Sequence, residues 1–124
     1  VGTAAVYGPS RVVMEEHWSR FGGASTWGAT TKIENIKKAI KPNTKVLYIE
    51  SPANPTLDIT DLAACSKIAK EHNLLLVVDN TISSPYLQRP FEYGADIVFH
   101  SMTKFINGHA DIVAGIIVTK DEAL

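Results

Sequence analysis

The sequence predicts an α/β protein with a doubly wound, mostly parallel sheet and helices on both faces. Short apolar runs rich in β-branched residues alternate with segments whose apolar residues recur at helical spacing. The chain has 124 residues, 45% of them hydrophobic, which is typical of a folded globular protein. It contains no internal repeat, low-complexity tract or linker, so we expect one compact unit at most.

The first expected element is a helix that begins near Ser10 and directs Met14, Trp18 and Phe21 inward. Two consecutive glycines follow Phe21, and glycine readily adopts the left-handed backbone that ends many helices. A short strand is possible directly afterwards, at residues 24–27. The N-terminal part of the chain is therefore expected to supply one helix and one strand.

Two more helices are expected in the middle of the chain. Isoleucines recur at helical spacing within residues 33–40, and apolar residues do so within residues 62–69. Thr60 is the candidate N-cap of the second helix. Cys65 lies at an apolar position of that helix, so we expect it to be a packed core thiol.

Strands are expected at residues 46–50 (VLYIE), 74–79 (LLLVVD) and 97–101 (IVFHS). These runs are apolar enough to be buried on both faces of a parallel sheet. Residues 114–119 (AGIIVT) show the same pattern and are predicted to form a similar strand. Strand and helix therefore alternate along most of the chain.

Charge and apolar content exclude several classes of partner. Lys and Arg total 12 and Asp and Glu total 13, so the net charge of -1 provides no field that attracts nucleic acid or an anionic membrane. The longest apolar runs fall short of the roughly 20 residues that span a bilayer, and no signal peptide is visible. Cys65 is the only cysteine, which excludes an internal disulfide and favours a reducing compartment. We therefore expect a cytoplasmic protein.

Polar residues gather where three of the predicted strands end. These segments are residues 50–55 (ESPANP), 79–81 (DNT) and 101–104 (SMTK). In open α/β sheets, ligands bind beyond the carboxyl ends of the strands. We therefore expect the functional site at this edge of the sheet.

Lys104 and Asp79 are the strongest candidates for chemistry. A lysine amine is a good nucleophile near neutral pH only if its charged form is disfavoured or if it is already held in an imine; otherwise Lys104 is a surface lysine. Asp79 ends an apolar strand, where an unpaired carboxylate is costly. Its cationic partner is either a structural salt bridge or a protonated pyridine nitrogen.

Ser101 and Thr103 flank Met102, so their hydroxyls lie on one side of an extended segment and can donate to a phosphate. The alternative is that they bond to nearby backbone after the strand ends. A metal site is not expected, because the spacing of the remaining candidates matches no recognised motif. Those candidates are His100, His109, Asp96 and Asp111.

Three features occur together: VVDNT, the S-x-T-K motif, and the 25-residue step from Asp79 to Lys104. With ESPANPTLDITDL, they make the chain resemble the Cys/Met-metabolism family of pyridoxal-phosphate enzymes. That family includes cystathionine γ-synthase, cystathionine lyases, methionine γ-lyase and O-acetylhomoserine sulfhydrylase. The resemblance extends from Val6 to the glycine-containing strand after His109.

The resemblance implies a role for each motif residue. Lys104 matches the lysine that holds pyridoxal 5'-phosphate as a Schiff base, and Asp79 matches the partner of the pyridine nitrogen. Ser101 and Thr103 match two of the phosphate contacts.

Two residues outside these motifs acquire roles only through the resemblance. Asn54 is similar in position to the asparagine that bonds the phenolic oxygen of the cofactor. Tyr7 matches the tyrosine that stacks on the ring and takes a proton-transfer role at the γ leaving group. Without the resemblance, Asn54 is a turn former between two prolines and Tyr7 an aromatic residue near a turn.

The implied activity is elimination or replacement at the β or γ carbon of a sulfur-containing amino acid or an activated homoserine. Residues 1–124 are expected to be a partial cofactor-binding large domain of the aminotransferase-like fold, without the C-terminal small domain and inactive alone. The full-length protein is expected to be a homodimer or homotetramer with a small amino-acid substrate.

The sequence leaves open which reaction is catalysed and whether the chain is catalytic at all. Pro9 and Ser10 stand where methionine γ-lyases typically carry a cysteine and a threonine, which argues against that one activity. The other reading is a non-catalytic α/β module that binds a ligand or partner and retains the motif only by ancestry.

Overall fold

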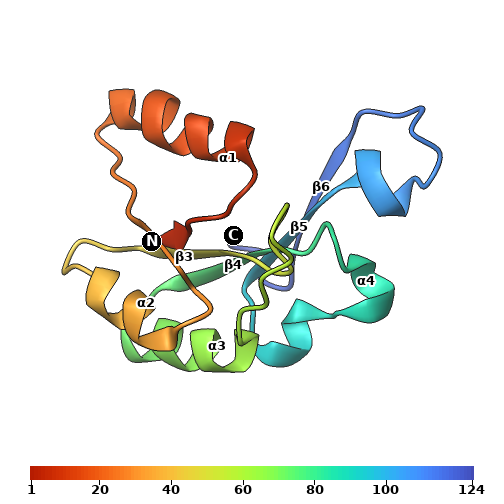
Figure 1. The fold of residues 1–124 in the computed structure, drawn as a ribbon. Coiled ribbons are helices and arrows are strands. Elements are labelled where there is room, and N and C mark those ends of the chain that lie inside the picture. Colours follow the sequence, from red (N-terminus) through yellow and green to blue (C-terminus); the bar gives the residue numbers. More distant parts are fainter.

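The computed structural model describes residues 1–124 and contains one six-stranded sheet with the order β2-β1-β3-β4-β5-β6 (Figure 1). The first five of these strands pair in parallel, and β6 runs antiparallel to β5. The strands are β1 (Gly2–Thr3), β2 (Trp27–Gly28), β3 (Val46–Glu50), β4 (Leu75–Asp79), β5 (Ile97–Ser101) and β6 (Gly115–Thr119). The predicted mostly parallel sheet is confirmed.

Helices cover both faces of the sheet, as a doubly wound fold requires (Figure 1). A helical segment formed by α1, η1 and η2 lies on one face, and α2 and α3 lie on the other. The helices are α1 (Gly8–Val12), η1 (Val13–His17), η2 (Trp18–Phe21), α2 (Ile33–Ala39), α3 (Leu62–Glu71), α4 (Ser84–Leu87), η3 (Pro90–Tyr93) and η4 (Met102–Ile106). None of these helices combines the length and the apolar character that a bilayer span requires.

The hydrophobic core lies between the sheet and the α2 and α3 helices. Alternate residues of β3, β4 and β5 point into it, because successive side chains of a strand face opposite sides. Burial of each such side chain stabilises the fold by about 1.5–3 kcal/mol. The buried cluster is Ile36, Leu47, Ile49, Leu62, Cys65, Ile68, Ala69, Leu74, Leu76, Val78, Ala95 and Val98. Cys65 is fully buried within it, and burial, with Asp61 nearby, raises the pKa of its thiol to about 12.

The N-cap of α3 is Asp61 and not Thr60, so the predicted cap was wrong by one residue. The Asp61 side chain accepts a hydrogen bond from the backbone N–H of Ala64 at 2.9 Å. Thr60 is instead buried, and its hydroxyl shares a 2.8 Å hydrogen bond with that of Thr30. Both residue types can cap a helix, and the tertiary contact with Thr30 decides between them.

The helical segment formed by α1, η1 and η2 ends at Gly22, whose φ of 80° is the expected left-handed conformation. The inward orientation predicted for Trp18 and Phe21 was wrong, since Trp18 is 60% exposed and Phe21 is 86% exposed. Met14 is partly buried. A helical period identifies an apolar face but does not supply a partner for it, so most of both aromatic side chains faces solvent.

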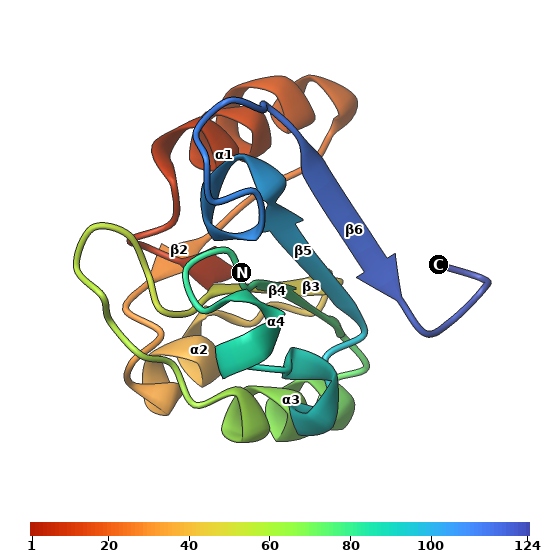
Figure 2. The same ribbon diagram turned by 90° about the vertical axis from the view of Figure 1, so that its right-hand side faces the viewer.

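The last strand also differs from its prediction. β6 is antiparallel, pairs only with β5, and is exposed at all five residues (Figure 2). An antiparallel return needs no crossover helix, so the connection at residues 102–114 can reverse the chain beside β5. The apolar content of β6 predicted burial on both faces of the sheet. Its position at the edge of the sheet instead leaves its side chains exposed to solvent.

Candidate functional site

Three neighbouring strands bring acidic and aromatic side chains into one row. Glu50 pairs in register with Asp79, and Asp79 pairs with Phe99. The preceding residues Ile49 and Val78 belong to the core on the α2 and α3 side. The row therefore faces the opposite side of the sheet, where the α1 segment lies (Figure 1). The carboxyl edge thus gathers the strand ends expected to form the site.

Asp79 is a buried carboxylate, 5% exposed, whose two hydrogen bonds both come from Thr81. Its Oδ1 accepts from the Thr81 N–H at 3.0 Å and from the Thr81 hydroxyl at 2.6 Å, while Oδ2 accepts none. Burial raises the pKa of Asp79, and the two bonds from Thr81 partly oppose that effect. The three ion pairs of the chain all lie elsewhere on its surface. The structural salt bridge considered for Asp79 is therefore absent.

His100 does not supply the missing cation. It is 5% exposed, and burial lowers the pKa of its imidazole, although Asp79 opposes this shift. No ion pair joins His100 to Asp79, and the buried Nδ1 of His100 has no hydrogen-bond partner. The carboxylate of Asp79 consequently has no cationic partner within this chain.

Thr81 connects the ends of β4 and β5. Its hydroxyl donates to Asp79 and accepts a 2.8 Å hydrogen bond from the Ser101 N–H. A hydroxyl has one proton to donate and lone pairs to accept with, so both bonds can form together. The sequence interpretation missed Thr81. The signal was present, because an aspartate commonly bonds the N–H two residues ahead of it.

The loop after β4 is fixed by a buried amide network. Asn80 is fully buried and donates from Nδ2 to the carbonyl oxygens of Ser84 at 3.1 Å and Gln88 at 2.8 Å. The Gln88 Nε2 group donates to Asn80 Oδ1 at 2.7 Å and to the Ser51 carbonyl at 2.8 Å. The network ties the end of β4 to the end of β3, so the segments that carry Asp79 and Asn54 are held together.

Glu50 contacts the backbone of two predicted site residues. It is 3% exposed; its Oε2 accepts from the Tyr7 N–H at 2.7 Å, and its Oε1 accepts from the Asn54 N–H at 2.9 Å. Burial raises the pKa of Glu50, and the hydrogen bonds from Asn54 and Tyr7 partly offset this. Nothing local in the sequence indicated this contact, because Tyr7 is 43 residues away.

Tyr7 and Asn54 present free side chains beside this row. Tyr7 immediately precedes α1 and is 50% exposed. Asn54 follows β3 and is also exposed, and neither side chain takes part in a hydrogen bond within the chain. Both side chains are therefore available to contact a bound molecule.

The S-x-T-K motif follows β5 at the same edge. Ser101 ends the strand with its hydroxyl unpaired. The Thr103 hydroxyl donates to the Ala114 carbonyl at 3.2 Å and accepts from the Ala114 N–H at 3.0 Å, as the backbone alternative anticipates. Lys104 is exposed, and its amine makes no ion pair or hydrogen bond.

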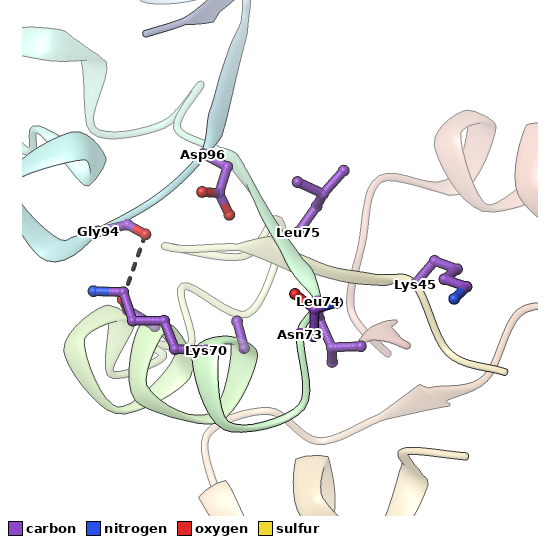
Figure 3. A pocket seen from close by; sticks show the side chains of 9 residues that line it. Lys45, Lys70, Asn73, Leu74, Leu75, Gly94 and Asp96 are labelled. Atoms are coloured by element: carbon purple, nitrogen blue, oxygen red, sulfur yellow. Dashed lines mark hydrogen bonds between the residues drawn. The ribbon is translucent and has the colours of Figure 1, made fainter. Parts of the chain in front are cut away.

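Two other regions hold none of the predicted site residues. A hollow of about 530 Å³ opens near the start of β4 (Figure 3), and the one side-chain hydrogen bond among its lining residues joins the Ser66 hydroxyl to the Gly94 carbonyl. It is lined by Lys45, Ser66, Ala69, Lys70, Asn73, Leu74, Leu75, Gly94 and Asp96. The candidates weighed for a metal do not form a cluster of three or more possible ligands.

The family profile described as Cys/Met metabolism PLP-dependent enzyme matches residues 1–124. An L-methionine gamma-lyase from Treponema denticola is 49% identical over 124 residues, which is 98% of this chain and 31% of the relative. A cystathionine gamma-lyase from Bacillus subtilis is 49% identical over 122 residues, covering 98% of this chain and 32% of the relative.

A solved structure shows the same fold. The crystal structure of cystathionine gamma-lyase from Lactobacillus plantarum, complexed with L-serine, matches with a TM-score of 0.94 and 41% identity over 98% of this chain and 32% of that one. The chain spans about a third of the length of the curated relatives it matches. Because the family profile and these similarities extend over nearly the whole sequence, the chain belongs to the Cys/Met metabolism family of PLP-dependent enzymes.

Proposed function

We propose that the protein containing this chain is a pyridoxal-phosphate enzyme that eliminates or replaces a group at the β or γ carbon of a sulfur-containing amino acid or an activated homoserine. One observation carries the proposal: the buried carboxylate of Asp79 has no cationic partner within the chain. A non-catalytic module would keep this carboxylate at a cost in stability and without a use. Family membership favours the enzyme as well.

The residues at the carboxyl edge fit the cofactor. The pyridine nitrogen requires an acceptor, and Asp79 Oδ2 accepts no hydrogen bond from the chain. Covalent attachment requires a primary amine, and Lys104 carries one with no competing partner at the same edge. Asn54 and Tyr7 would contact the phenolic oxygen and the ring face. When bound, the cofactor supplies an electron sink for charge that develops on the substrate.

Asp79 and Thr81 act on the cofactor's ring together. A carboxylate beside the pyridine nitrogen keeps that nitrogen protonated and thereby strengthens its pull on electrons. Thr81 holds Oδ1 with two hydrogen bonds, which fixes the direction of the carboxylate and leaves Oδ2 for the ring. A bound cation would also relieve the cost of burying Asp79.

Lys104 and Tyr7 are the proposed catalytic residues. Lys104 would hold the cofactor covalently, and its amine, when free, would move protons at the α and β carbons of the substrate. Tyr7 would exchange a proton with the leaving group at the γ carbon. Its position directly before α1, with half of its surface exposed, is compatible with that role.

Ser101 and Thr103 are the proposed phosphate contacts. The free hydroxyl of Ser101 can donate without rearrangement. The Thr103 proton is already donated to the Ala114 carbonyl, so Thr103 has to turn its hydroxyl to serve a phosphate. We therefore propose Ser101 as the stronger of the two contacts.

The site also needs residues from beyond this chain. We propose that residues 1–124 form part of the large cofactor-binding domain, since longer relatives match the chain over about a third of their length. A homodimer or homotetramer is the proposed assembly. The methionine and cystathionine gamma-lyase relatives are equally similar, at 49% identity, so they support the reaction class and not one substrate.

Reduction of the cofactor-loaded, full-length protein with borohydride tests the proposal. We expect an absorption band at about 420 nm that disappears on reduction, with the label recovered on the peptide that contains Lys104. A label on another lysine, or no visible band at saturating cofactor, would contradict the assignment.

A further inference from the structure

Glu50 is a buried carboxylate to which the proposed chemistry assigns no task. It ends β3 beside Asp79, is 3% exposed, and forms no ion pair. Burying a carboxylate without a cation is unfavourable, and a neutral apolar residue would fit the end of a buried strand more easily. Its presence therefore calls for a specific contact.

The two carboxylate oxygens of Glu50 each accept a hydrogen bond from a backbone N–H group. Oε2 accepts from Tyr7, 43 residues away, and Oε1 accepts from Asn54, four residues away. The distances of 2.7 Å and 2.9 Å are those of charge-assisted hydrogen bonds. One carboxylate thus links two otherwise separate segments, the turn before α1 and the loop after β3.

The two linked segments carry the residues proposed to contact the cofactor ring. Tyr7 would cover the ring face and Asn54 would bond its phenolic oxygen, and both side chains are exposed and free of internal hydrogen bonds. Without Glu50, no side-chain hydrogen bond of this chain would join these two segments, so their separation would not be fixed by a direct link.

Only a carboxylate can make both bonds at this position. A glutamine of the same shape has one accepting oxygen, and its NH₂ group would face one of the two N–H donors. A shorter aspartate keeps the charge but does not reach both amides from the same backbone position.

We propose that Glu50 is a positioning residue that holds Tyr7 and Asn54 at a fixed separation and so sets the space in which the cofactor ring lies. The inference rests on the proposed function, because it takes Tyr7 and Asn54 as ring contacts. Glu50 itself does not touch the reacting atoms.

The test compares Glu50→Gln with wild type in the full-length protein, using hydrogen exchange of the cofactor-free form and cofactor affinity. Loss of one charge-assisted bond should speed exchange at the Tyr7 or Asn54 amide by about tenfold or more. Cofactor affinity should fall by a similar factor, with attachment still at Lys104. Glu71→Gln, an exposed residue at the end of α3, is the matched control and should change neither quantity.

Exchange within α3 (Leu62–Glu71) shows whether the variant is folded. If Glu50→Gln does not fold, Glu50→Asp is judged by the same two measurements. It should weaken the hydrogen bond from the Tyr7 or the Asn54 amide and so speed hydrogen exchange there. Unchanged exchange at both amides, with cofactor affinity within about twofold of wild type, would overturn the inference. A failed proposed function is distinguishable, because wild type itself would then show no cofactor attached to Lys104.

Discussion

The two faces of strands β3 and β4 differ in the kind of side chain that they bury. Toward α2 and α3, Ile49 and Val78 are fully buried among apolar neighbours that the chain itself supplies. Toward α1, Glu50 and Asp79 come next in the same strands and are buried as acids with no cation nearby. Burial raises the pKa of both carboxyl groups, so the fold disfavours their ionised forms. The apolar face stabilises the fold, whereas burial of the two acids costs stability, a cost that the proposed cofactor would offset.

Tyr48 reinforces this contrast from the acidic face. Its side chain is 8% exposed, and its pKa is raised first by burial and then by Asp79 and Glu50. Three acidic groups therefore share one side of the sheet. A cationic group placed beside them would be favourable, whereas the apolar face has no such requirement.

The largest expected effect comes from removing Lys104 at the acidic edge. Lys104→Ala should lower kcat/KM by about a thousandfold or more, because attachment of the cofactor and proton movement both need this amine. Unfolding free energy should change by no more than about 0.5 kcal/mol, since the side chain is exposed. Steady-state kinetics and thermal unfolding measure the two, with the exposed Lys67→Ala as a control. Near-normal turnover would refute the assignment.

The apolar face should show the reverse pattern. Ile49→Ala should lower the unfolding free energy by about 3 kcal/mol, because it opens a cavity in a fully buried core. Residual activity per folded molecule should stay near wild type. Denaturant unfolding with parallel activity assays tests this, and a loss below about 1 kcal/mol would show that the core is looser than its burial indicates.

Asp79→Asn should lower turnover by about a hundredfold while the fold is retained. The amide oxygen can still accept both bonds from Thr81, but an amide cannot keep the pyridine nitrogen protonated. A fall in kcat of less than about tenfold, or roughly 1.4 kcal/mol, would contradict the proposed role of Asp79.

Thr81→Val should have the smallest of these effects, a decrease in turnover of about tenfold. The change removes the hydroxyl that joins Asp79 to the Ser101 N–H but preserves the shape of the side chain. Thr119→Val, on the exposed β6 strand, serves as the control. Equal kinetics for the two variants would mean that Thr81 does not position Asp79.

The sheet could be predicted because its strands are bounded by polar residues. The expected strands at 46–50 and 97–101 have the same bounds as β3 and β5, and β4 begins one residue later than expected. The apolar content of a strand does not reveal, however, whether it runs parallel or antiparallel to its neighbour, or where it lies in the sheet. The exposed, antiparallel β6 shows this, because its partner and its place at the edge depend on the whole sheet.

The candidate site was predictable only where its residues follow one another in sequence. Asp79 and Lys104 stand at strand ends in recognisable motifs, whereas Glu50 acts through Tyr7, which no local pattern connects to it. Thr81 lies between these cases, since its bond to Asp79 is local and its bond to Ser101 is not. The roles proposed for all the site residues remain predictions, namely those of Lys104, Asp79, Asn54, Ser101, Thr103 and Tyr7.

The stability of Asp79→Asn as a function of pH tests the central claim most directly. Because burial raises the pKa of Asp79 above its value in the unfolded chain, ionisation at higher pH costs folding stability that is recovered as pH falls. Cofactor-free Asp79→Asn should therefore unfold at a higher temperature than wild type at pH 8, and the difference should shrink toward pH 5. Added cofactor should stabilise wild type more than the variant. A variant that is less stable at every pH, and equally stabilised by cofactor, would show that Asp79 is a structural residue.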